Sequence, residues 1–237
     1  MGNRENRPSA PVGWTAQGRA ANVGYSRKEE EEMLKLYYAP GTCALASHIT
    51  LKESGLDFTV ERIDTRNSQQ TTPAYLAINP KGRVPALVTD RGILTENPAI
   101  LAYVAQCAPA AKLMPSDAFE YAQAQSFNSY LCSTVHVNHA HKGRGARWAT
   151  EQSSFDDMKR KVPESMAAAF ALIERGMVKG PWVMGEQYTA CDAYLFTLTG
   201  WAEADGVDLA KLPKVAAHRQ RMSERPAVQQ VLAVEKA

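Results

Sequence analysis

Cys43 is the residue of this sequence with the clearest capacity for chemistry. It follows a turn at Pro40 and Gly41 and precedes the apolar stretch "ALASHI". A thiol at the N-terminus of a helix is stabilised as the thiolate, so its pKa is expected to fall from about 8.5 toward about 7 or below. The position therefore predicts a reactive thiol. The alternative is a buried structural cysteine, which is the commoner role of a free cysteine.

Position 46 is alanine, so no second cysteine stands three residues after Cys43. A dithiol cycle is therefore not available at this site, whereas a mixed disulfide formed by one thiol is. The remaining cysteines lie within helical patterns and are predicted to pack in the core: Cys107, Cys132 and Cys191. None of the four forms a CxxC pair, and this spacing favours a reducing, cytoplasmic compartment over a secreted disulfide framework.

Three histidines follow one another closely in a later helical segment, namely His136, His139 and His141. His136 and His139 share a helix face, but His141 points elsewhere. No carboxylate or thiol clearly completes a tetrahedral ligand set. A solvated polar face is therefore expected here, and no metal site is predicted.

Length and composition describe an ordinary soluble globular protein. The chain has 237 residues, of which 45% are hydrophobic and 22% charged, with a net charge of +2. This length suits one large domain or two small ones around a buried core. The balanced charge gives no reason to expect nucleic acid or an anionic membrane as a partner, and no apolar run approaches the ~18 residues of a membrane span.

The chain divides into a tail, an α/β domain, a linker and a helical domain. Residues 1–32 are polar and rich in Gly and Pro, which predicts a disordered extension, with Met33 as an alternative start of translation. Residues 33–108 are predicted to fold in the order βαβ-α-ββα. Strands are expected over 34–38, 57–64, 84–89 and 92–95, and helices over 43–55, 72–79 and 97–108. Asn97 is the expected N-cap of the last helix.

Residues 109–117, which contain two prolines, are the expected linker, and residues 118–237 are predicted to be all helical. Helical periodicity is found over 118–141, 156–178, 190–203 and from 213 onward. Thr189 and Asp192 match the reciprocal capping arrangement at the start of the third of these helices. The residues that follow are apolar nearly all round, so this helix is expected at the centre of a bundle.

Four segments together resemble the glutathione S-transferases, most closely the bacterial beta class. They are "YYAPGTCALASHITLKESGLDF", "YLAINPKGRVPAL", "LTENPAILAYVA" and "TACDAYLF". The match spans residues 33 to about 232. It implies a thioredoxin-like N-terminal domain followed by a C-terminal helical bundle. It also implies a cytoplasmic, homodimeric detoxification enzyme with glutathione as co-substrate and no metal.

The resemblance assigns glutathione contacts to two short segments. If the Val84–Pro85 bond is cis, the N–H and C=O of Val84 are free to pair with an extended peptide; a trans, edge-strand proline is the alternative. Glu96 and Asn97 would hold the γ-glutamyl end, because a helix N-terminus favours a carboxylate and Glu96 can pair with the amine. The alternative is that both residues merely start a helix.

His136 stands where the beta class carries an active-site histidine. Asn128 lies eight residues earlier on nearly the same helix face, and Ser133 lies near that face, so both are candidate glutathione contacts. His136 can hydrogen-bond the thiol or the leaving group of the electrophile. The alternative is a half-buried polar histidine in the wall of the cleft. The beta class commonly carries lysine after this histidine, but this chain has Val137.

The segment after Val137 departs from the family by carrying Lys142, Arg144, Arg147 and Trp148. Arginines here can bind an anionic co-substrate, or they can offset the dipole at a solvated helix end. The leading hypothesis is conjugation of glutathione to small electrophiles, with Cys43 and His136 as catalytic residues. The alternatives are a glutathione-dependent thiol-disulfide reductase that uses one cysteine, and a non-catalytic ligand-binding protein on the same fold.

Overall fold

The structure, a computed structural model, describes residues 34–236. The predicted tail over residues 1–32 lies outside this range. Within the described residues, the first part of the chain forms a four-stranded sheet in the order β2-β1-β3-β4. Its strands are β1 (Leu34–Tyr38), β2 (Phe58–Arg62), β3 (Ala86–Thr89) and β4 (Gly92–Thr95). β1 runs parallel to β2 and antiparallel to β3, which pairs antiparallel with β4.

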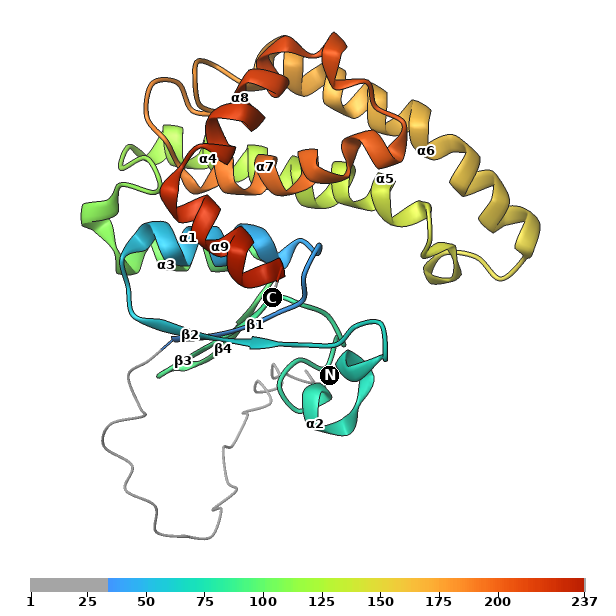
Figure 1. Cartoon of the computed structure of the whole chain (residues 1–237), viewed down its shortest axis with the longest axis horizontal. Coiled ribbons are helices and arrows are strands. Elements are labelled where there is room, and N and C mark those ends of the chain that lie inside the picture. Colours follow the sequence, from blue (N-terminus) through green and yellow to red (C-terminus); the bar gives the residue numbers. More distant parts are fainter. Residues whose placement is uncertain (1–33, 237) are drawn as a thin grey trace, which may run out of the picture. The chain divides into compact units, whose positions relative to one another are not determined.

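Helices cover both faces of this sheet, as Figure 1 shows. They are α1 (Ala44–Ser54), α2 (Pro73–Leu76) and α3 (Asn97–Cys107). α1 and α3 lie on one face, where Leu36 of β1 belongs to the main core, and α2 lies on the other, where Tyr37 packs with Tyr75. Successive residues of a strand point to opposite faces, so burial on both sides explains why Leu36, Tyr37 and Tyr38 of β1 are all apolar or aromatic.

The second part of the chain is helical. Its helices are α4 (Ala118–Tyr130), α5 (His136–His141), α6 (Gln152–Leu172), α7 (Ala190–Ala202), α8 (Pro213–Ser223) and α9 (Pro226–Lys236). π-helical turns over Leu131–Val135 and Ile173–Met177 follow α4 and α6. The sequence predicts no strand in this part. Among its described residues, Trp182 and Gly185 form only an isolated bridge.

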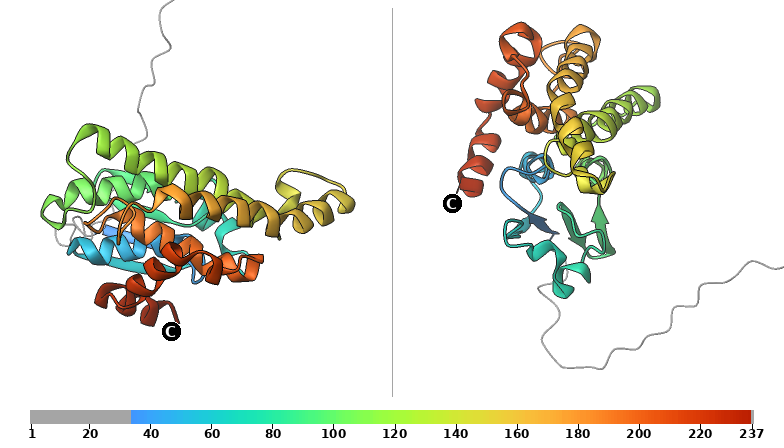
Figure 2. Two further views of the ribbon diagram at one scale, coloured as in Figure 1. Left: turned by 90° about the horizontal axis from the view of Figure 1, so that it is seen from above. Right: turned by 90° about the vertical axis from the view of Figure 1, so that its right-hand side faces the viewer.

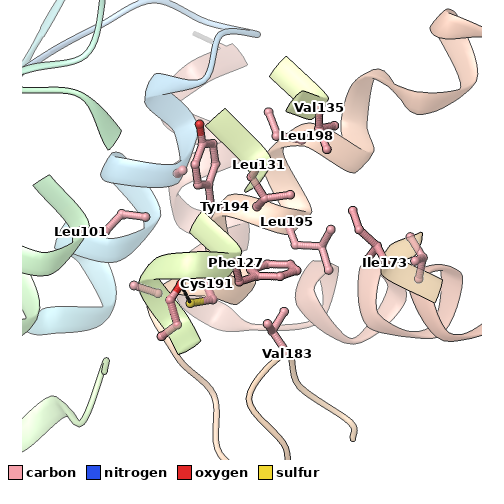
Figure 3. Close-up of a cluster of buried hydrophobic side chains, with 14 of the residues drawn as sticks. Leu101, Phe127, Leu131, Val135, Ile173, Val183, Cys191, Tyr194, Leu195 and Leu198 are labelled. Atoms are coloured by element: carbon pink, nitrogen blue, oxygen red, sulfur yellow. Dashed lines mark hydrogen bonds between the residues drawn. The ribbon is translucent and has the colours of Figure 1, made fainter. Parts of the chain in front are cut away.

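α7 is the central helix, as its apolar sequence predicts. It packs against α1, α3, α4 and α8 (Figure 2). Figure 3 shows Leu195 and Leu198 of α7 among Phe127, Leu131 and Val135 of the neighbouring chain segment. The thiol of Cys191 points to the carbonyl of Ala124 at 3.5 Å, and this cysteine is fully buried, as predicted.

The capping box at the start of α7 is confirmed and extends into a buried network. The Asp192 carboxylate accepts hydrogen bonds from the Thr189 N–H at 2.7 Å and from the Val183 N–H at 2.7 Å. It also lies 3.0 Å from Nε2 of His218 on α8. Asp192 has no exposed surface, so its partners must replace all of its hydration. One side chain therefore joins α7, α8 and the loop before α7.

The C-terminal helix α9 is held against the first part of the chain by two polar contacts. Arg225, just before α9, donates to both carboxylate oxygens of Glu53 on α1, at 2.6 and 2.8 Å. At the other end, Glu235 lies 3.3 Å from Nδ1 of His48, and both side chains are buried. These contacts hold α9 against α1.

Asp192→Asn is predicted to destabilise the protein by about 2–4 kcal/mol, because the new amide presents a donor to buried N–H groups. Denaturant unfolding followed by circular dichroism measures this loss. Asp157→Asn, in an exposed ion pair with Arg160 on α6, is the control and is expected to cost less than about 1 kcal/mol. Equal unfolding midpoints for the two variants would contradict the role assigned to Asp192.

Candidate functional site

A cavity of about 390 Å³ opens between the α1–α3 end of the first part and the α5–α7 wall of the second. Its lining includes six of the eight predicted site residues: Cys43, Val84, Pro85, Glu96, Asn97 and His136. These residues are up to 93 positions apart in sequence, as between Cys43 and His136. The fold thus brings together the thiol, the Val-Pro segment, the start of α3 and the histidine.

Cys43 is the residue immediately before α1, as predicted, but its thiol is not in the expected state. Its Sγ donates to the carbonyl oxygen of Val84 at 3.5 Å and makes no capping hydrogen bond to α1. Burial raises the pKa of the Cys43 thiol to about 12, although the positive charge of Arg144 opposes this shift. The prediction of a lowered pKa is therefore wrong. Donation to a carbonyl favours the neutral thiol, and desolvation disfavours the thiolate.

The Val84–Pro85 peptide bond is cis, as the resemblance implies. The chain before it is anchored at the carbonyl oxygen of Arg83. That oxygen accepts from the Tyr75 hydroxyl at 2.8 Å and from Nδ2 of Asn79 at 2.6 Å. The Val84 backbone is therefore held at the cavity wall by two side chains of the α2 region.

Glu96, not Asn97, is the N-cap of α3, which corrects the sequence prediction. Its carbonyl oxygen accepts from the Ala99 and Ile100 N–H groups, and its carboxylate lies 2.5 Å from Nζ of Lys81. Glu96 has φ 73° and ψ 121°, a conformation that costs a non-glycine residue about 1–3 kcal/mol and that concentrates at functional sites.

Asn97 is the first residue of α3, and its side chain faces inward. Nδ2 donates to the Cys43 carbonyl at 2.8 Å, and Oδ1 accepts from the Ser47 hydroxyl at 2.6 Å. Both polar ends of this side chain are engaged within the protein, so a ligand contact at Asn97 is expected through its backbone. Its backbone N–H, in the first turn of α3, is the group that a helix N-terminus offers to an anion.

His136 lies in the cavity wall with its ring beside Trp201, at a centroid distance of 5.2 Å. Burial, followed by the positive charges of Arg144 and His139, lowers the pKa of His136 to about 4. The imidazole is therefore neutral at pH 7. It can donate one hydrogen bond and accept another, but at that pH it does not act as a charged imidazolium acid.

Asn128 and Ser133 do not line the cavity, so the structure does not support their assignment as ligand contacts. A helix rises about 1.5 Å per residue, which places Asn128 roughly 12 Å along the helix from His136. There its side chain is fully buried against the core, with neither polar atom hydrogen-bonded among the described residues. Ser133 is exposed to solvent. A shared helix face is thus not sufficient to share a cavity.

Of the three cysteines predicted for the core, one lies elsewhere and one is shared between the core and the cavity. Cys107, at the end of α3, is exposed, so the prediction of core packing is wrong for it. Cys132 is half-buried, packs partly against the core and also lines the cavity. Burial raises the pKa of Cys132 as well, with a further contribution from Glu96. Two thiols therefore line the cavity, and burial raises the pKa of both, which favours their neutral form.

Several cavity residues were not singled out from the sequence. Trp201 of α7 donates from Nε1 to the carbonyl of Gly41 at 3.1 Å, across 160 positions of sequence. Its ring stacks on His139 at a centroid distance of 4.2 Å. Tyr194, also on α7, faces the cavity about two turns of helix before Trp201, and Gln70 and Arg83 line it from the first part. No local pattern marks these residues, because their contacts are long-range.

The segment over residues 142–148 divides between two environments. Lys142 turns away from the cavity and pairs with the buried carboxylate of Asp205 at 3.1 Å. The same carboxylate lies 2.6 Å from Nδ1 of His139. Arg144, Arg147 and Trp148, by contrast, line the cavity.

His141 contacts Trp148, with ring centroids 4.5 Å apart. Over residues 34–236, no group of three or more His, Cys, Asp or Glu side chains is arranged to hold a metal ion. Among the helices of this range, none has the length and hydropathy that a membrane span requires.

Comparison with known proteins matches both parts of the chain to one family. The model of the glutathione S-transferase N-terminal domain matches residues 32–106, and that of the C-terminal domain matches residues 132–226. Glutathione S-transferase GstA of Escherichia coli O157:H7 is 36% identical over 205 residues, covering 85% of this chain and 98% of the relative. Glutathione S-transferase GST-4.5 of Xanthomonas campestris pv. campestris is 32% identical, with the same coverage of each chain.

Solved structures agree with this assignment. A glutathione transferase homologue from Sulfitobacter with bound glutathione is 48% identical, with a TM-score of 0.83 over 85% of this chain and 98% of that one. A beta-class glutathione S-transferase from Sphingomonas chungbukensis is 31% identical, with a TM-score of 0.74 over 85% and 98%. The thioredoxin-like sheet, the helical bundle and these matches define a bacterial-type glutathione transferase fold. The chain belongs to the glutathione S-transferase family.

Proposed function

We propose that this protein conjugates glutathione to small electrophiles, with the glutathione sulfur held beside Cys43. The observation that carries the proposal is the convergence of the Cys43 thiol, the Val84 backbone and the start of α3 on one cavity. An extended peptide pairs with an exposed main chain, and a helix N-terminus accepts a carboxylate. Relatives that are named glutathione S-transferases, two of them solved with glutathione, support it.

Cys43 acts in this proposal as a hydrogen-bond donor. With a pKa of about 12, its thiol keeps its proton at neutral pH and can donate to a glutathione thiolate. Stabilising that thiolate lowers the pKa of the bound glutathione and creates the nucleophile near pH 7. A reductase mechanism needs Cys43 itself as the attacking thiolate. The raised pKa therefore favours conjugation over the one-cysteine reductase.

Glu96 and the first turn of α3 hold the γ-glutamyl end in this proposal. The Glu96 carboxylate is well exposed, although it pairs with Lys81 in the absence of ligand. The ammonium of glutathione competes for that carboxylate, and its α-carboxylate meets the Asn97 N–H. His136, as a neutral imidazole, donates a hydrogen bond to the leaving group or to the sulfur.

We also propose that the protein is a cytoplasmic homodimer that acts in detoxification. Two large apolar side chains are exposed on elements that both pack beside α3. They are Ile93 on the edge strand β4, which is 43% exposed, and Phe119 on α4, which is 71% exposed. A second copy of the chain that covers these side chains would remove apolar surface from water.

Glu96→Gln is predicted to weaken glutathione binding about 10-fold, because the neutral amide loses a charge-assisted bond to the ligand ammonium. Titration calorimetry with glutathione measures the change. Glu164→Gln, in an exposed ion pair with Lys161 on α6, is the control and is expected to bind like the wild type. A wild-type protein that shows neither heat of binding nor a thermal shift with millimolar glutathione would rule out the proposed function.

Phe119→Glu is predicted to convert the dimer to a monomer, because it places a charge in the proposed interface. Light scattering is expected to give twice the chain mass of 26.0 kDa for the wild type and the single mass for the variant. Leu172→Glu, at an apolar side chain on α6 that is 44% exposed, is the matched control. A wild-type mass of one chain at micromolar concentration would overturn the dimer.

A further inference from the structure

Three guanidinium groups converge on the cavity without a carboxylate to neutralise them. Arg83, Arg144 and Arg147 all line it, and none of the three forms an ion pair with another of the described residues. The neighbouring cations are different, because Lys81 pairs with Glu96 and Lys142 pairs with Asp205. The cavity lining thus has an excess of positive charge.

These charges act on one another and on the reacting groups. Burial, then the positive charges of Arg83 and Arg144, lowers the pKa of the Arg147 guanidinium. Arg144 is also the largest electrostatic influence on the Cys43 thiol and on the His136 ring. Like charges that repel one another are stabilised when an anion binds between them. Because Arg144 acts on Cys43, an anion bound by Arg144 is expected to lie close to the glutathione sulfur.

Glutathione supplies too little negative charge to satisfy this set. It carries two carboxylates and one ammonium, and its γ-glutamyl end is held at Glu96 and α3 in the proposed function. One glycyl carboxylate then remains for three guanidiniums. Since a single carboxylate accepts a bidentate bond from one arginine, two guanidiniums are left for another ligand.

The segment that carries Arg144 and Arg147 is held in place by close packing. A Cβ atom at Gly145 would lie 2.8 Å from Cδ1 of Phe155 on α6, so this glycine allows the backbone to approach the helix. The Arg144 N–H donates to the Ala140 carbonyl at 2.9 Å. The two arginines therefore extend from a fixed backbone next to α5.

Trp148 indicates a second property of the ligand, an aromatic ring. Its side chain is 46% exposed and lines the cavity beside the arginines. A partly exposed indole offers a flat apolar face on which an aromatic ring stacks. We infer that the second substrate is a planar aromatic electrophile that carries a carboxylate, with the carboxylate bound by Arg144 and Arg147. This inference rests on the proposed function, and it specifies that the co-substrate is negatively charged.

The step can be written for an activated aryl chloride. The glutathione thiolate attacks the ring carbon that bears chlorine, and its electron pair forms the new C–S bond. The ring holds the displaced pair until the C–Cl bond breaks and chloride leaves with that pair. The thiol proton passes to solvent, so glutathione and the aryl chloride give a thioether, chloride and a proton. No oxidant or reductant is required.

Two substrates of the same shape that differ in charge test the inference, namely 4-chloro-3,5-dinitrobenzoate and its methyl ester. After correction for the uncatalysed rates, kcat/KM is expected to favour the benzoate in the wild type. Arg144→Gln is expected to lower the ratio of the benzoate value to the ester value about 10- to 100-fold, the effect of losing a charged hydrogen bond, because a change felt at Cys43 or His136 alters both values alike. Arg144→Lys should recover part of the loss. Arg160→Gln, on the solvated face of α6, is the control.

Binding of the two glutathione conjugates by calorimetry separates this inference from the proposed function, because binding needs no turnover. Tighter binding of the carboxylate conjugate than of its ester, abolished by Arg144→Gln, supports the inference even if turnover is slow. Equal affinities for the two conjugates in the wild type would overturn it while leaving the proposed function intact. So would an Arg144→Gln variant that loses affinity for glutathione alone. Failure of glutathione itself to bind would overturn both.

Discussion

One buried amide, that of Asn97, joins the two helix ends that form the sulfur side of the cavity. Its Nδ2 donates to the Cys43 carbonyl at 2.8 Å and its Oδ1 accepts from Ser47 at 2.6 Å. Loss of either bond would leave a buried polar group unpaired, at a cost of about 1–3 kcal/mol. The start of α1 is thereby fixed against the start of α3. Since Cys43 precedes one helix and Glu96 precedes the other, this amide sets the separation of the groups that would hold the sulfur and the γ-glutamyl end of glutathione.

The opposite wall is fixed by Trp201, which donates to the carbonyl of Gly41 in the turn before Cys43. His139 stacks on the Trp201 ring and contacts the buried carboxylate of Asp205, which also binds Lys142. These contacts hold the end of α5, and so the segment that carries the cavity arginines, against α7. The enclosed thiol is consequently desolvated, and desolvation outweighs the helix N-terminus and the nearby arginine in setting its pKa.

Local signals allowed most of the fold to be predicted from the sequence. The strand before Pro40, the helix that ends at Gly55 and the capping box of Thr189 with Asp192 depend on neighbouring residues, and all three are present. The predictions that failed depend on distant contacts. Asn97 faces inward because Cys43 and Ser47 meet it there, and Asn128 is enclosed by the core. The family resemblance identified the cis proline, which sequence statistics alone would not have favoured.

The central claim is that Cys43 is a neutral thiol that donates to the glutathione sulfur. The pH dependence of its alkylation by iodoacetamide, followed by mass spectrometry in the glutathione-free protein from pH 6 to 10, tests this most directly. Exposed Cys107 serves as the internal reference for the reagent. Since poor access also slows a half-buried thiol, the measurement is the shape of the pH profile and not the absolute rate. A pKa of about 12 predicts a Cys43 rate that rises about tenfold per pH unit and is still rising at pH 10. A plateau reached near pH 7 would contradict the claim and identify Cys43 as a reactive thiolate.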